Sequence, residues 1–80
     1  VINNFSGLGH DAKLGRYSCL MSFVNVAGGA DIGAEVFVAS NVLVAPKVKV
    51  GAGAYLGAGS VVLKKVRAGA KVFGNPALEI

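Results

Sequence analysis

Aliphatic residues recur at every sixth position over most of the chain. The series comprises Ile2, Leu8, Leu14, Leu20, Val26, Ile32, Val38, Val44, Val50, Leu56 and Val62. An α-helix does not fit, because its period of about 3.6 residues would spread these side chains around the helix. Side chains alternate between the two faces of a strand. The aliphatic position and the position four residues later are an even number of residues apart, so they point the same way. The pattern therefore predicts short strands that turn their aliphatic residues toward a common interior.

Two further positions repeat with the same period. The residue after each aliphatic is usually small, as in Gly9, Gly15, Ala27, Gly33, Ala39, Ala45, Gly51 and Gly57. The residue four positions after it is small or β-branched, as in Ser6, Ala12, Ser18, Val24, Ala30, Val36, Val42, Val48, Ala54 and Ser60. The small residues allow the chain to turn corners, and glycine suits a corner that needs positive φ.

One strand and one corner make a flat side, and three sides close a triangle of about 18 residues, whose copies stack about 4.8 Å apart. Residues one coil apart, such as Leu20 and Val38, then lie side by side. We expect an all-β fold, a parallel β-helix of hexapeptide repeats with three to four coils. The expected inward residues are Leu14, Leu20, Val26, Ile32, Val38, Val44, Val50 and Leu56.

The regular repeat ends at Val62. We expect residues 1–62 to form the β-helix, and residues 63–80 to form the terminal coil and C-terminal exit of the same domain. The chain begins at Val1 without a methionine, so we expect either a fragment or a trimmed chain. No apolar run approaches the roughly 18 residues that a membrane span needs. A single cysteine, Cys19, excludes an internal disulfide and favours the cytoplasm.

Charge is uneven along the chain. The net charge is +4, and the second half holds Lys47, Lys49, Lys64, Lys65, Arg67 and Lys71. Such a basic half could attract a phosphate-bearing ligand or nucleic acid, or it could be a solvated surface. We expect no nucleic-acid binding, because the two tyrosines and four phenylalanines belong to no known binding motif.

The only histidine, His10, falls two residues after Leu8 and therefore at a corner. Asp11 follows it, and Gly28 lies 18 residues later, one coil on. Acyl transfer from a thioester needs a general base, which imidazole can supply, and a donor for the carbonyl oxygen. A glycine main chain lets the acyl group approach closely. A plain surface histidine is the alternative. A three-histidine zinc site, as in hexapeptide-repeat carbonic anhydrases, is excluded, so we expect no metal.

Several segments carry a resemblance to a known family. They are Ile2-Asn3, Leu8-Gly9-His10-Asp11, Leu14-Gly15 and Gly74-Asn75-Pro76-Ala77. Together they resemble the sialic-acid O-acetyltransferase family of hexapeptide acyltransferases, which includes nucleotide-amino-sugar N-acetyltransferases. The similarity covers essentially the whole chain. It implies a left-handed β-helix, acetyl-CoA as acyl donor, and a sugar or nucleotide-sugar amine or hydroxyl as acceptor.

The same resemblance implies roles for individual residues around the reaction. His10 would be the catalytic base and Asp11 its orienting carboxylate. The Gly28 amide would bind the thioester carbonyl. Asn3 would lie near the acceptor or the histidine.

The resemblance also implies where the cofactor would bind. The main-chain amides of Ser40 and Ala58, 18 residues apart on another corner, would line the pantetheine groove. Lys64 or Lys65 would reach the CoA phosphates.

The resemblance further implies a homotrimer with active sites between subunits, where Phe5, Phe23, Phe37 and Tyr55 would fill the interfaces. Two departures favour a different interpretation. The family usually carries an N-terminal nucleotide-binding-like domain, and Cys19 stands where some relatives have a second histidine. The alternative is a non-catalytic trimerising β-helix module, a truncated or degenerate acyltransferase.

Overall fold

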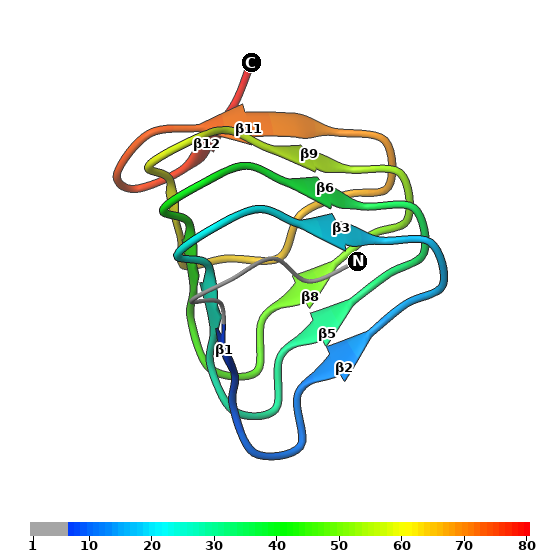
Figure 1. Cartoon of the computed structure of the whole chain (residues 1–80). Coiled ribbons are helices and arrows are strands. Elements are labelled where there is room, and N and C mark those ends of the chain that lie inside the picture. The colour runs from blue at the N-terminus through cyan, green and yellow to red at the C-terminus, as the bar shows by residue number, and fades with distance from the viewer. Residues whose placement is uncertain (1–6) are drawn as a thin grey trace.

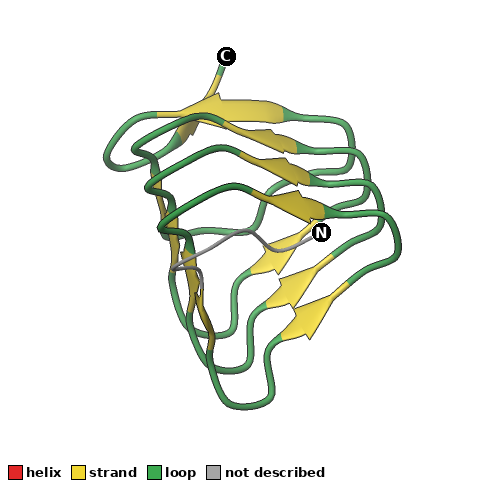
Figure 2. Ribbon diagram, in the orientation of Figure 1, coloured by secondary structure: helices red, strands yellow, loops and turns green. Residues whose placement is uncertain are grey.

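The computed structural model describes residues 7–80 of the chain. These residues form twelve short strands joined by turns, and no helix. The chain winds as a triangular solenoid whose three sides carry stacked short strands (Figures 1 and 2). The coils are left-handed, as the family resemblance implied. Among these residues, no helix is long and apolar enough to cross a membrane.

Each side of the triangle is a sheet of stacked strands. The first side has the order β1 (Gly7–Leu8), β4 (Asn25–Val26), β7 (Leu43–Val44) and β10 (Val61–Val62). The second has β2 (Lys13–Leu14), β5 (Asp31–Ile32) and β8 (Lys49–Val50). The third has β3 (Cys19–Leu20), β6 (Phe37–Val38), β9 (Tyr55–Leu56), β11 (Lys71–Phe73) and β12 (Leu78–Glu79).

Register within the sheets follows the repeat. Leu20 pairs with Val38 and Val38 pairs with Leu56, so stacked residues are one 18-residue coil apart. All strand pairs are parallel except that of β11 with β12. The structure thus confirms the predicted parallel β-helix.

The interior of the coils holds the aliphatic residues of the repeat. Of the eight residues expected to point inward, seven are buried, namely Leu20, Val26, Ile32, Val38, Val44, Val50 and Leu56. Leu14 is half-buried and Leu8 is 41% exposed. Both belong to the first described coil. Their strands, β1 and β2, are the end strands of their sheets and pair with the next coil on one side only, among the described residues.

The corners depend on two kinds of special residue. From Leu8 to Leu56, the third residue after each aliphatic of the repeat has positive φ. At six of these corners it is not glycine: Asp11, Tyr17, Phe23, Glu35, Asn41 and Lys47. The glycine directly after an aliphatic residue has a different role, because it lets the main chain of the next coil come close. A Cβ at Gly9 would lie 2.4 Å from the Gly28 nitrogen, and one at Gly51 would lie 2.3 Å from the Ala68 nitrogen. These glycines let successive coils touch main chain to main chain.

The last coil is shorter than the others. Val66 lies beside Val50 and Val72 beside Leu56, so stacked residues are 16 apart in place of 18. The chain then reverses, and β12 runs antiparallel along β11. This strand provides β11 with main-chain partners on its outer edge, which is how the C-terminal end of the solenoid is closed.

Candidate functional site

His10 and Gly28 lie next to each other on one corner of the triangle. This first corner follows the first side and contains residues 9–12, 27–30 and 45–48. The Gly29 nitrogen donates a hydrogen bond of 2.9 Å to the His10 carbonyl oxygen. A Cβ built at Gly28 would lie 3.0 Å from that same oxygen. The His10 side chain is 94% exposed, so the ring is open to solvent at this corner.

Asp11 follows His10 at the turn of the corner. Its φ of 61° places it in the left-handed region, which aspartate tolerates better than most side chains. One carboxylate oxygen, Oδ2, lies 3.4 Å from His10 Nε2, and the Asp11 side chain is 79% exposed.

The carbonyl oxygen and the amide of Gly28 differ in their hydrogen bonding. Its carbonyl oxygen accepts a hydrogen bond of 3.1 Å from the Lys47 nitrogen. Its amide donates to no main-chain carbonyl within residues 7–80. An unpaired N–H on a half-buried glycine can donate to a ligand oxygen without competition from the fold.

The structure separates Ser40 and Ala58 from His10. They lie on the third corner, which joins the third side to the first and contains residues 21–24, 39–42 and 57–60. There the Gly59 nitrogen donates to the Ser40 carbonyl oxygen over 3.0 Å, so the two corner segments are stacked. One whole side of the triangle stands between this corner and His10 within a single chain.

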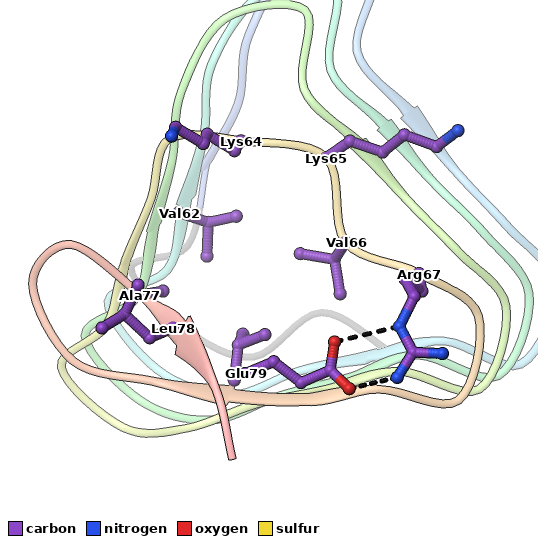
Figure 3. Close-up of a pocket in the computed structure, with 9 residues that line it drawn as sticks. Val62, Lys64, Lys65, Val66, Arg67, Ala77, Leu78 and Glu79 are labelled. Atoms are coloured by element: carbon purple, nitrogen blue, oxygen red, sulfur yellow. Dashed lines mark hydrogen bonds and ion pairs between the residues drawn. The ribbon is translucent and has the colours of Figure 1, made fainter.

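Lys64 and Lys65 lie farther along the solenoid, in the last coil. They border a cavity of about 170 Å³ at the end of the core, with Val62, Val66 and Val72 among its lining. In Figure 3 the two lysine side chains extend in different directions across this end. The cavity is therefore the end of the hydrophobic interior, and His10 does not line it.

An ion pair that the sequence analysis did not foresee lies at the same end. Arg67 Nε donates to Glu79 Oε1 over 3.0 Å, and its Nη2 donates to Oε2 (Figure 3). These hydrogen bonds lower the pKa of Glu79 and raise that of Arg67. The two residues are 12 apart in sequence and come together only because β12 folds back over the last coil.

The structure does not test the expected positions of Asn3 and Phe5, and it bears on metal binding only for the described residues. Asn3 and Phe5 lie outside the described residues. Within residues 7–80, no group of three histidine, cysteine or acidic side chains could hold a metal ion.

The repeat and the coil stack together have known relatives. A family profile described as bacterial transferase hexapeptide (six repeats) matches residues 29–64. The match thus covers 36 of the 80 residues and lies within the regular repeat. Among solved structures, a histidine-to-asparagine variant of perosamine N-acetyltransferase from Caulobacter crescentus, in complex with CoA and GDP-perosamine, is 29% identical. The TM-score is 0.96, over 98% of this chain and 37% of that one.

Other similar structures share the fold of this hexapeptide-repeat domain. PerB from Caulobacter crescentus, also with CoA and GDP-perosamine, is 24% identical with a TM-score of 0.88, over 100% of this chain and 53% of that one. A hexapeptide transferase family protein from Anaplasma phagocytophilum is 17% identical with a TM-score of 0.68, over 99% and 65%. The chain thus spans less than two thirds of these proteins. A comparison with curated proteins gives no significant match.

Proposed function

We propose that this hexapeptide-repeat domain carries the acyl-transfer site of an acetyl-CoA-dependent acetyltransferase. The acceptor is an amine or hydroxyl of a sugar or nucleotide sugar. The observation that carries the proposal is that the exposed His10 lies on the same corner as Gly28, in the adjacent coil, with the two main chains in contact. The similarity to a perosamine N-acetyltransferase that binds CoA and GDP-perosamine supports the choice of donor and acceptor.

The chemistry follows from these two groups. His10 accepts the proton of the acceptor amine or hydroxyl as its nitrogen or oxygen bonds to the thioester carbonyl carbon. The Gly28 N–H donates to the oxygen that becomes negatively charged in the tetrahedral intermediate. The carbon–sulfur bond then breaks, and the leaving thiolate takes the proton from the imidazolium. Asp11 orients the ring and stabilises its charged form.

The cofactor part of the proposal extends to residues remote from His10. The amides of Ser40 and Ala58 bind the pantetheine arm, and Lys64 or Lys65 binds CoA phosphates. Asn3 contacts the acceptor or the histidine. Because the third corner is one side of the triangle away from His10, a single chain does not offer both as one continuous surface. A second subunit would bring a third corner to a first corner.

The proposed assembly is therefore a homotrimer, and the third side is the face best suited to it. The rings of Phe37 and Tyr55 stack there with centroids 5.3 Å apart, although the side chains are 36% and 42% exposed. The outward residues of the second side are charged instead: Lys13, Asp31 and Lys49. Aromatic surface gains most from burial against a partner, and charged surface gains least.

Location in the cytoplasm is part of the same proposal. Cys19 is a free thiol in the structure. An acetyl-CoA donor and an unpaired cysteine both fit a reducing compartment.

Calorimetric titration with acetyl-CoA tests the proposal directly. Binding of acetyl-CoA by the wild-type chain, with transfer to an amino sugar nucleotide, is the expected result. A folded trimer that binds no acetyl-CoA would overturn the proposal and favour a non-catalytic trimerising module. Because the chain spans only 37% of its 29% identical relative, the titration should be repeated with the full reading frame.

A further inference from the structure

Positive charge increases along the axis of the solenoid toward its C-terminal end. Residues 1–35 hold three acidic and two basic residues, whereas residues 36–80 hold one acidic and six basic residues. The net charges of these two parts are −1 and +5, which together give the +4 of the chain. Because the described coils stack in chain order, the asymmetry lies along the axis (Figure 1). An anionic partner is therefore attracted to the C-terminal end.

The lysines that cross this end are not neutralised by acids. The single acid of the basic half, Glu79, pairs with Arg67. Lys64 and Lys65 lie in the segment that crosses the end of the core, and both are exposed (Figure 3). In the described part of the chain, neither lysine forms an ion pair. Two ammonium groups without a carboxylate partner thus border the cavity at the end of the core.

A large aliphatic side chain, Leu63, is exposed beside these lysines. It holds the position directly after the inward residue of the first side, which is occupied by Ala27 and Ala45 in the two preceding coils. Those alanines lie under a stacked coil, whereas Leu63 belongs to the last coil and is 54% exposed. The fold therefore accepts alanine at this position, and the leucine adds apolar surface that faces water.

Strand β12 brings a second exposed leucine to the same end. The Ala77 nitrogen donates to the Val61 carbonyl oxygen over 2.9 Å, so the chain enters β12 beside the strand that precedes Leu63. Leu78 is 67% exposed and borders the same cavity as the two lysines. These two leucines and the two lysines form the end surface. Exposed aliphatic side chains next to unneutralised charge are typical of an interaction surface.

We propose that the end surface docks on the anionic face of a phospholipid bilayer. The lysines pair with headgroup phosphates, and the leucines enter the boundary between headgroups and acyl chains. The association is peripheral, because no helix of the described residues is long and apolar enough to cross a membrane. In the proposed homotrimer, a threefold axis along the solenoids would turn three end surfaces toward the same bilayer and strengthen the association.

The combination of charge and apolar surface selects the partner. A nucleic acid would use the lysines and leave the leucines in water. A second copy of the end surface would cover the leucines but bring like charges together, which is unfavourable. An anionic bilayer accommodates both kinds of side chain. The inference does not depend on acyl transfer, since lipid binding is measurable without acetyl-CoA. The proposed CoA contact uses only one of the two lysines.

Cosedimentation with lipid vesicles tests the inference. The wild-type chain should bind vesicles of phosphatidylcholine and phosphatidylglycerol in equal amounts, and it should bind phosphatidylcholine vesicles far more weakly. Binding to the anionic vesicles should weaken as salt is added, because salt screens the lysine charges. Lys65→Gln should lower the affinity about five-fold, the effect of one lysine at an anionic lipid surface.

Two matched controls separate the end surface from the rest of the molecule. Lys13→Gln makes the same change on an exposed lysine of the first described coil, three strand spacings or roughly 14 Å along the axis. That distance exceeds the Debye length of about 8 Å, so this variant should bind like the wild type. Leu63→Ala should weaken binding about five-fold or more. Leu43→Ala, on the flat first side where the leucine is 45% exposed, should not.

Three results would overturn the inference. The first is a folded wild type that does not bind the anionic vesicles, and the second is equal binding by Lys65→Gln and Lys13→Gln. The third is lysine-dependent binding to duplex DNA or polyglutamate without binding to vesicles, which would assign the end surface to a polyanion or an acidic protein. A chain that binds vesicles but no acetyl-CoA would support this inference and count against the proposed acetyltransferase.

Discussion

The carbonyl oxygen of His10 accepts a hydrogen bond of 2.9 Å from the amide of Gly29, in the coil stacked next to it. This bond fixes the corner that carries the histidine against the corner that carries the glycines. The main chains at His10 and at Gly28 therefore keep their relative position.

Removal of the imidazole should affect transfer and leave the fold intact. In His10→Ala we expect turnover to fall by about 10²–10⁴-fold, the range for a lost general base. The melting temperature should hardly change, because the side chain is 94% exposed. Acetyl-CoA affinity should also persist, since the proposed cofactor contacts are mostly main chain. Asp11→Asn should reduce turnover less. Equal turnover in the wild type and His10→Ala, at equal acetyl-CoA affinity, would remove the histidine from the mechanism.

Gly28→Ala probes the space over the proposed oxyanion donor. The new Cβ would lie 3.0 Å from the His10 carbonyl oxygen, next to the Gly28 amide in the chain. Loss of one such donor typically lowers turnover by about 10²–10³-fold, and partial blocking should give a smaller decrease. Ala34, Ala52 and Ala58 occupy the same position in other corners, so the variant should fold. Full activity in a folded Gly28→Ala would show that the thioester binds elsewhere.

Phe37→Glu tests the third side as the subunit contact. A carboxylate beside Tyr55 would have to be buried in the interface, and an unpaired buried charge is strongly unfavourable. Sedimentation should show a shift from trimer toward monomer. Lys49→Glu, on the charged second side, is the control and should remain trimeric. A trimeric Phe37→Glu together with a monomeric Lys49→Glu would exchange the roles of the two faces.

The Arg67–Glu79 pair should make the closure by β12 dependent on pH. Hydrogen bonds from Arg67 lower the pKa of Glu79 in the folded state. The stabilisation is therefore present above the ordinary glutamate range, roughly pH 4–5. It is lost as the pH falls through the lowered pKa. Hydrogen exchange at the Ile80 amide, which donates to the Lys71 carbonyl oxygen over 2.9 Å, reports this closure.

Near neutral pH, Glu79→Gln should speed that exchange, and the difference from the wild type should vanish in acid. Glu35→Gln, at an exposed corner far from β12 in sequence, should exchange like the wild type at both pH values. If Glu79→Gln and the wild type exchange at the same rate near neutral pH, the pair does not hold β12 in place.

Gly51→Ala tests the close approach between the last two coils. Its Cβ would meet the Ala68 nitrogen at 2.3 Å, and the atoms around it are main chain, which cannot move aside easily. We expect a loss of stability of about 1–3 kcal/mol or more in denaturant unfolding. Gly7→Ala is the control, since its nearest contact would be an ordinary 3.4 Å to Asn25 Oδ1. Similar unfolding midpoints for the two variants would contradict the geometry of this corner.

Several features of the molecule were determined by the sequence alone. A period of six in the aliphatic residues fixes which side chains face inward, and Leu20, Val38 and Leu56 are all fully buried. The same period makes residues 18 apart neighbours, so the proximity of His10 and Gly28 could be predicted. Both results depend only on the alternation of side chains along a strand and on the closure of three sides.

Other features required the tertiary structure. The repeat ends at Val62, but only the fold shows that Val66, and not Ala68, stacks on Val50. That choice shortens the last coil and lets β12 fold back to pair Glu79 with Arg67. Likewise, Tyr17 has no sequence signal for positive φ, which the corner imposes on whatever residue stands there. Local preference governs strands and corners, whereas long-range stacking decides where the regular pattern breaks and which exposed groups meet.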